Sequence, residues 1–234
     1  MKTGLRLVAG ALACSACLAP SAPAASADGI RQSAKAVFSE RDRGASTALR
    51  LAIDYVNPAD PEAKPPPVRS VALTLARGSR IDTGAVPVCE AADAELMTQG
   101  PAPCADSVVG GGVVTLDTGF PEPFRFLDND LTLLNAADEV IFLFRQRQLG
   151  VRLASHAQIE GRTITATAPF LPGTPPDGAA ADTVDETFNA TAAGAYISTP
   201  PRCPRSRRWT NRMRFTYDDG VTQTVRSRSR CRRR

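Results

Sequence analysis

Residues 208–230, RWTNRMRFTYDDGVTQTVRSRSR, predict a β-hairpin near the carboxyl end of the chain. Asp218-Asp219-Gly220 fits a three-residue hairpin loop, in which a type I turn ends with glycine in the left-handed region. With this loop, Tyr217 pairs with Val221, and one face of the hairpin is apolar: Trp209, Met213, Phe215, Tyr217, Val221 and Val225. The opposite face carries threonines and arginines. A shift of one residue would mix the two sets, so the pattern itself selects the register.

The same register places arginines opposite one another on the polar face of the hairpin. Arg208 faces Arg230, Arg212 faces Arg226, and Thr210 faces Arg228. Several arginines on one face can neutralise phosphates or uronates, which gives salt-sensitive binding. Six arginines are therefore the candidate residues for binding a polyanion: Arg208, Arg212, Arg214, Arg226, Arg228 and Arg230. Three other roles stay open for this face: pairing with acidic residues elsewhere, solubility, and protection of a strand edge.

Charge is unevenly distributed along the chain. Residues 202–234 hold 12 arginines and two acids, a net charge of +10, whereas residues 28–201 hold 14 basic and 22 acidic side chains, a net charge of −8. The sequence does not identify a partner for the basic hairpin, and two candidates stay open: an anionic polymer of the cell envelope and extracellular DNA. Genomic nucleic acid is not expected as the partner, because the chain carries a predicted export signal.

Residues 1–27 have the features of a secretory signal peptide. Lys2 and Arg6 precede a short apolar run, and Ala25-Ser26-Ala27 supplies a small-residue cleavage pattern. The apolar run is too short for a bilayer of about 30 Å, and no transmembrane segment is predicted. The expected location is therefore secreted or in the cell envelope, with cleavage after Ala27. Lipid attachment at Cys17 is the alternative to a free amino terminus.

Four cysteines follow the predicted signal peptide: Cys89, Cys104, Cys203 and Cys231. An even count in an exported chain favours disulfides, and four cysteines allow three pairings. We predict Cys89–Cys104 and Cys203–Cys231, because each of these pairs brackets a compact local segment. The C-x₂-C pairs of zinc sites are absent, so no metal site is predicted.

Alternating apolar and polar residues predict strands in most of the remaining sequence. In Ala48–Tyr55, Leu49, Leu51, Ile53 and Tyr55 are expected to face inward. Similar patterns occur at 69–75, 113–117 and 162–168, whereas Val140–Phe144 is apolar on both faces and is expected to lie centrally. The proline-rich stretches 57–67 and 171–182 are expected to be loops.

The predicted fold is all-β, an antiparallel β-sandwich of immunoglobulin-like or jelly-roll-like type with two local disulfides. One short helix is expected at Glu90–Met97. Residues 28–234 are expected to form a single sandwich domain, and Phe120-Pro121-Glu122-Pro123 marks an alternative boundary between two subdomains.

Few side chains are equipped for catalysis. His156 is the only histidine and is expected to have a structural or surface role. Gly110-Gly111-Gly112 leads into a strand rather than a helix, so it is expected to be a flexible turn and not a phosphate cradle. Asp128-Asn129-Asp130 and the acids in 177–186 lack the spacing of a calcium loop and are expected to be solvated turns. No catalytic residue, metal or cofactor is predicted.

Three stretches resemble a group of small secreted actinobacterial proteins that have no assigned activity. These are Ser70–Leu75 leading to Cys89, Cys104–Gly112, and Tyr196–Cys203 continuing through Trp209 and Phe215–Gly220 to Cys231. Ala105 stands where the group usually has proline. The resemblance implies an exported, disulfide-linked β protein and supplies no catalytic residues.

Two classes of function follow from these observations. The first is a non-catalytic secreted module with a binding or structural role. The alternative is a secreted hydrolase that acts on polysaccharide through Asp or Glu, which requires two carboxyl groups about 5–9 Å apart.

Overall fold

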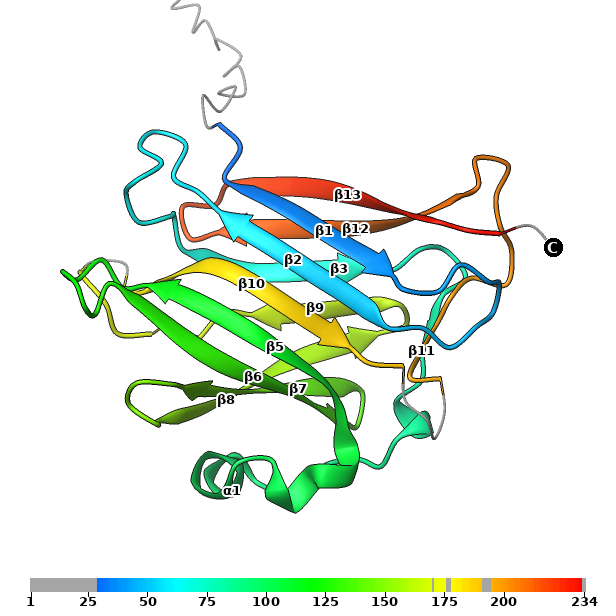
Figure 1. Cartoon of the computed structure of the whole chain (residues 1–234), viewed down its shortest axis with the longest axis horizontal. Helices are drawn as coiled ribbons and strands as arrows, with labels where there is room; N and C mark the ends of the chain where they lie inside the picture. The colour runs from blue at the N-terminus through cyan, green and yellow to red at the C-terminus, as the bar shows by residue number, and fades with distance from the viewer. Residues whose placement is uncertain (1–28, 170, 176–177, 191–194, 233–234) are drawn as a thin grey trace, which may run out of the picture.

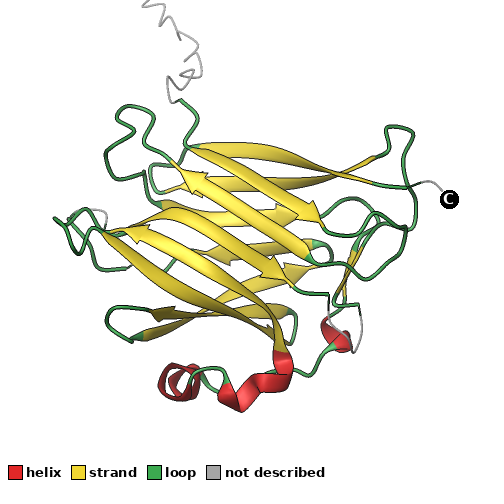
Figure 2. Cartoon of the chain, viewed as in Figure 1, coloured by secondary structure: helices red, strands yellow, loops and turns green. Residues whose placement is uncertain are grey.

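The computed structural model describes residues 29–169, 171–175, 178–190 and 195–232. The predicted signal peptide and Cys17 lie outside the described residues. Nearly all regular structure is β (Figures 1 and 2), as the sequence predicts. The strands are β1 (Gln32–Phe38), β2 (Leu49–Tyr55), β3 (Val68–Thr74), β4 (Arg80–Ile81), β5 (Val108–Asp117), β6 (Phe126–Ala136), β7 (Glu139–Gln146), β8 (Arg152–Glu160), β9 (Thr163–Thr167), β10 (Ala180–Phe188), β11 (Ile197–Ser198), β12 (Arg208–Tyr217) and β13 (Thr222–Arg230). The helices are α1 (Asp93–Gln99) and two 3₁₀ turns, Thr83–Ala85 and Ala102–Ser107.

Eleven strands belong to one sheet that curls into a barrel-like shape. Its order is β1-β2-β10-β5-β6-β7-β8-β9-β3-β12-β13, and each neighbouring pair is antiparallel. β4 and β11 form a separate two-stranded sheet. A two-sheet sandwich is therefore not confirmed, because hydrogen-bonded neighbours continue from β1 round to β13. Local alternation of side chains is the same in both architectures, so it cannot distinguish them.

Side chains join the two end strands of this sheet. Strand directions alternate along the order, so β1 and β13 run parallel. The Oγ of Ser227 accepts a hydrogen bond from the backbone amide of Ala36 at 3.0 Å, and the Oγ of Ser229 accepts one from Phe38 at 2.9 Å. Asn211, on the adjacent strand β12, donates to the carbonyl of Ala36 at 2.9 Å. These bonds satisfy backbone groups of β1 that have no strand partner on that side.

The carboxyl-terminal hairpin has the predicted register. Trp209 pairs with Ser229, Arg212 with Arg226, and Met213 with Val225. Gly220 has a φ of 85°, the left-handed conformation that the loop requires. The apolar side chains of β12 are buried inside the sheet, and the predicted disulfide Cys203–Cys231 is formed at the open end of the hairpin.

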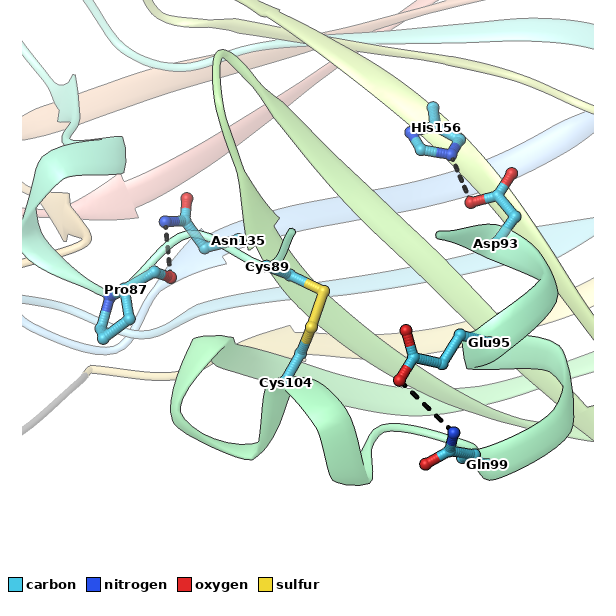
Figure 3. Close-up of a disulfide and its surroundings, with 8 residues drawn as sticks. All are labelled: Pro87, Cys89, Asp93, Glu95, Gln99, Cys104, Asn135 and His156. Carbon is cyan, nitrogen blue, oxygen red and sulfur yellow. Dashed lines mark hydrogen bonds and ion pairs between the residues drawn. A yellow bond between two sulfur atoms is a disulfide. The ribbon is translucent and has the colours of Figure 1, made fainter. Parts of the chain in front are cut away.

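A second small core covers the outer face of β6–β8 and explains why β7 is apolar on both faces. Val140 faces the main core, whereas Ile141 and Leu143 pack with Leu96 of α1. The predicted disulfide Cys89–Cys104 lies in this second core and ties down the segment that carries α1 (Figure 3). The helix begins at Asp93 and ends at Gln99, slightly later than Glu90–Met97.

The prediction of a flexible turn at Gly110–Gly112 is wrong, because these glycines lie inside β5. They allow close contact between backbones. A Cβ added to Gly110 would lie 2.1 Å from the carbonyl oxygen of Thr187, and one added to Gly112 would lie 2.1 Å from that of Asp185. Glycine is therefore required at these positions, where β5 pairs closely with β10.

Candidate functional site

The six arginines proposed from the sequence lie on one exposed face of the β12–β13 hairpin, which we name the arginine face. Arg208 and Arg230 are directly opposite each other, as are Arg212 and Arg226. Arg228 lies opposite Thr210, and Arg214 lies opposite Thr224. All six side chains are exposed, because alternate residues of both strands point away from the core: Arg208, Arg212, Arg214, Arg226, Arg228 and Arg230.

Within the described residues, none of these six arginines forms an ion pair with a carboxylate. Other arginines of the chain do: Arg50 lies 2.8 Å from Asp185, and Arg147 lies 2.8 Å from Asp130. Both acids of the hairpin loop bind arginines outside the arginine face, since Asp218 pairs with Arg69 and Asp219 with Arg31. The described acidic residues therefore form no ion pairs with the arginine face, and the role of internal charge pairing is not observed among them.

The neighbouring strands extend the arginine face without adding carboxylates. Arg212 pairs with Thr74 of β3, and Arg214 pairs with Ala72. Across β3, Thr74 pairs with Thr163 of β9, and their hydroxyl oxygens lie 3.1 Å apart. The resulting surface carries guanidinium groups on one side and hydroxyl groups on the other, which is suited to oxyanions and polar polymers.

The interior of the barrel-like sheet contains a cavity of about 610 Å³. Eight strands supply its lining, which is mainly aliphatic and aromatic, as in Ile53, Leu131, Phe142 and Ile164. Pro67, Leu149, Pro172 and Asp218 also line it and come from loops at one end of the sheet, on the left in Figure 1. The cavity therefore reaches the surface at that end.

The side chain of Glu186, a residue of β10, points into this cavity. Glu186 lies between Leu51 of β2 and Gly112 of β5. Its exposed fraction is 7%, and within the described residues it makes no hydrogen bond or ion pair. Burial raises the pKa of Glu186 to about 7, because an apolar surrounding disfavours the charged form.

Sequence reasoning missed this residue. The sequence predicts a loop at 171–182 and solvated turns for the acids in 177–186, but Ala180–Phe188 form β10, so both predictions are wrong for these residues. Residue 177 of that acidic stretch lies outside the described residues. Asp185 points outward to Arg50, whereas Glu186 points inward. The sequence signal for Glu186 is its position in the alternation. Val184 and Phe188, two residues before and after it, lie on the same inward face of β10.

The other acidic candidates, Asp128 and Asp130, lie inside β6, so the prediction of a solvated turn at 128–130 is wrong. Neighbouring side chains contact both carboxylates. Asp128 accepts a hydrogen bond from the hydroxyl of Thr115 at 2.8 Å, and Asp130 lies close to both Arg147 and Arg145. In the described lining of the cavity, the carboxyl groups are Glu186 and Asp218, and Asp218 is held at the mouth by Arg69. The hydrolase hypothesis requires two carboxyl groups close together. In the described lining, Glu186 is the one carboxyl group inside the cavity, so the second is not found there.

His156 joins the sheet to α1, which agrees with a structural role. Its Nδ1 lies 2.9 Å from Glu139 Oε1 on β7. Its Nε2 lies 3.0 Å from Asp93 Oδ1 at the start of α1, the contact drawn in Figure 3. Partial burial alone lowers the pKa of His156, but the hydrogen bonds and charges of these two carboxylates outweigh it, so the net shift is upward.

Comparisons with known proteins give no further assignment. A scan of protein-family models finds no match to this chain, and a search of curated proteins finds no matching relative. Among the helices in the described part of the chain, none has the length and apolarity that crossing a membrane requires. The arginine face and the cavity are therefore the two features of this chain that point to a function.

Proposed function

We propose that this protein is an extracellular binding protein whose arginine face holds a linear anionic polymer of the cell envelope. The observation that carries the proposal is the absence of a carboxylate partner for any of the six arginines within the described residues. Like charges directly opposite each other on a sheet are destabilising, by an amount on the order of 0.2–1 kcal/mol per pair. A bound polyanion removes this repulsion.

The spacing of the arginine face suits a repeating ligand. Arg226, Arg228 and Arg230 are alternate residues of β13, and alternate residues of an extended strand are about 6.8 Å apart. The second row, on β12, lies one strand spacing away, about 4.8 Å. Two parallel rows of cations match a chain that carries a phosphate or carboxylate on each repeat better than a single small anion.

An extracellular location is supported by the two disulfides, Cys89–Cys104 and Cys203–Cys231, because such bonds persist in oxidising compartments. The predicted signal peptide at residues 1–27 agrees with this location. The polymers that meet the protein there are phosphate-bearing or uronate-bearing chains rather than genomic nucleic acid.

The test measures binding of inorganic polyphosphate and of polygalacturonate over a range of salt concentrations. We expect the wild type to bind at least one of them with an affinity that falls steeply as salt rises. The variant Arg226→Thr/Arg228→Thr should bind more weakly, and the slope of log affinity against log salt should decrease by about 1.5–2.

The matched control is Arg41→Thr/Arg77→Thr. These two arginines are exposed, lie in loops outside the hairpin, and change the net charge by the same amount. If the control weakens binding as much as the hairpin variant does, net charge and not the arginine face is responsible. If the wild type binds neither polymer at low salt, the proposal fails.

A further inference from the structure

We propose that the cavity inside the barrel-like sheet binds one small apolar molecule that carries a protonated amine, and that the carboxylate of Glu186 pairs with this amine. This site is separate from the arginine face, since Glu186 points into the interior and the six arginines point outward.

The cavity has the size and lining of a ligand site. Its volume of about 610 Å³ falls within the usual range of about 300–1,000 Å³ for small-molecule pockets. Curled antiparallel sheets either fill their interior with side chains or hold one small ligand. Here the side under β12 is filled by Trp209, Met213 and Phe215, which are buried in the core.

Small side chains keep the other side of the interior open. Ser155 of β8, Ala166 of β9 and Ala181 of β10 line the cavity where larger residues would fill it. Leu131 and Phe142 provide apolar walls. Binding in such a space is favourable for an apolar molecule, because it removes apolar surface from water.

Glu186 gives the cavity a chemical preference. The residues beside it in register, Leu51 and Gly112, supply no side-chain donor. The ionisable groups in the described lining are Tyr55, Arg69, Arg152, Glu186 and Asp218. Of the two arginines, Arg69 binds Asp218 at the mouth, and Arg152 donates to backbone carbonyls of α1 at 3.3–3.4 Å. Within the described residues, the lining of the cavity therefore supplies no cation for Glu186.

An amine meets this preference better than a hydroxyl group does. A buried carboxylate without a partner is among the most unfavourable groups in a protein interior, and a cation compensates its charge directly. Burial also raises the pKa of Glu186, so the ionised form is expected to be recovered when a cation binds.

The experiment uses octylamine, octanol and octanoate, three probes with the same apolar chain and different heads. Their affinities are measured at pH 8 through displacement of the neutral apolar dye N-phenylnaphthylamine and through calorimetry. We expect the wild type to bind octylamine at least about tenfold more tightly than octanol, and octanoate most weakly, because a charge-assisted hydrogen bond is stronger than a neutral one.

Two variants test the residue assignment. Glu186→Gln keeps the size of the side chain and removes its charge, so octylamine and octanol should bind with nearly equal affinity while the dye still enters. Asp185→Asn is the matched control. It removes the same charge from the preceding residue, whose side chain is exposed and faces Arg50. It should leave the preference for octylamine unchanged.

A third variant tests the cavity itself. Ala166→Phe adds volume to the lining and should reduce the affinity of both the dye and octylamine at least severalfold. The proposal is overturned if the wild type binds neither dye nor octylamine, if octanol binds as tightly as octylamine, or if Glu186→Gln retains the preference. Polyphosphate binding of the same variants should equal that of the wild type, so failure here is distinguishable from failure of the polymer proposal.

Discussion

The Nε2 of His156 lies 3.0 Å from Oδ1 of Asp93, and this contact attaches the first residue of α1 to the sheet. The pKa of His156 is raised in the folded protein, so the protonated form is stabilised by folding. This stabilisation is fully present below the unfolded pKa of about 6.5 and is lost as the pH rises through the folded value. His156→Gln should therefore lower stability more at pH 5.5 than at pH 9.

The expected loss at pH 5.5 is below about 1 kcal/mol, because solvent screens a partly exposed pair. Chemical denaturation at the two pH values measures it. A double-mutant cycle with Asp93→Asn isolates the contact, and additive effects of the two substitutions would mean that the histidine does not hold the helix.

Glu186 should make stability depend on pH in the opposite sense to that of a paired acid. Its pKa rises from 4.5 to about 7 on folding, so the native state favours the protonated form. Stability should fall as the pH rises through this window and should level off above it. Glu186→Gln removes the fall and should be more stable than the wild type by about 3 kcal/mol at pH 8, since each pKa unit corresponds to about 1.4 kcal/mol. Parallel stability curves for both proteins between pH 4 and pH 8 would contradict the burial of this carboxyl group.

The side-chain contact that joins β1 to β13 should make stability depend on Ser229. Ser229→Ala leaves the amide of Phe38 without its acceptor in a buried place, and a lost partner of this kind costs about 1–3 kcal/mol. Thr224→Ala, on the exposed face of the same strand, should change stability by less than about 0.5 kcal/mol. Equal effects of the two substitutions on the unfolding midpoint would show that Ser229 does not hold β13 to β1.

The inward face of β12 should not tolerate a charge. Met213 is buried in the core, so Met213→Asp should destabilise the protein by several kcal/mol. The adjacent residue provides the control: Arg214 is exposed, and Arg214→Asp should have a small effect on the thermal unfolding midpoint. A melting curve for Met213→Asp that matches the wild type would place this side chain outside the core.

The hairpin could be predicted from the sequence because its determinants are local. Gly220 fixes the loop, and the alternation on both sides fixes the register, so Met213 and Val225 are paired as expected. The disulfides were predictable for the same reason, since each joins cysteines that are close in the chain. The six arginines follow from the same alternation.

The architecture and the cavity depend on relationships that sequence alternation does not contain. β3 pairs with β9 and β12, and β10 lies between β2 and β5, so the neighbours of these strands are distant in the chain. The inward position of Glu186 becomes visible only when residues 180–188 are assigned to a strand. The preceding prolines and acids favoured a loop instead.

Closure of the sheet has a consequence for the order of folding. Phe38 and Ser229 are 191 positions apart, so the ring cannot be completed until β13 has been synthesised. Contacts of such long range favour slow folding. A chain shortened before residue 222 would leave the edge of β1 open to a strand from a second molecule, which makes truncated products of this protein prone to aggregate.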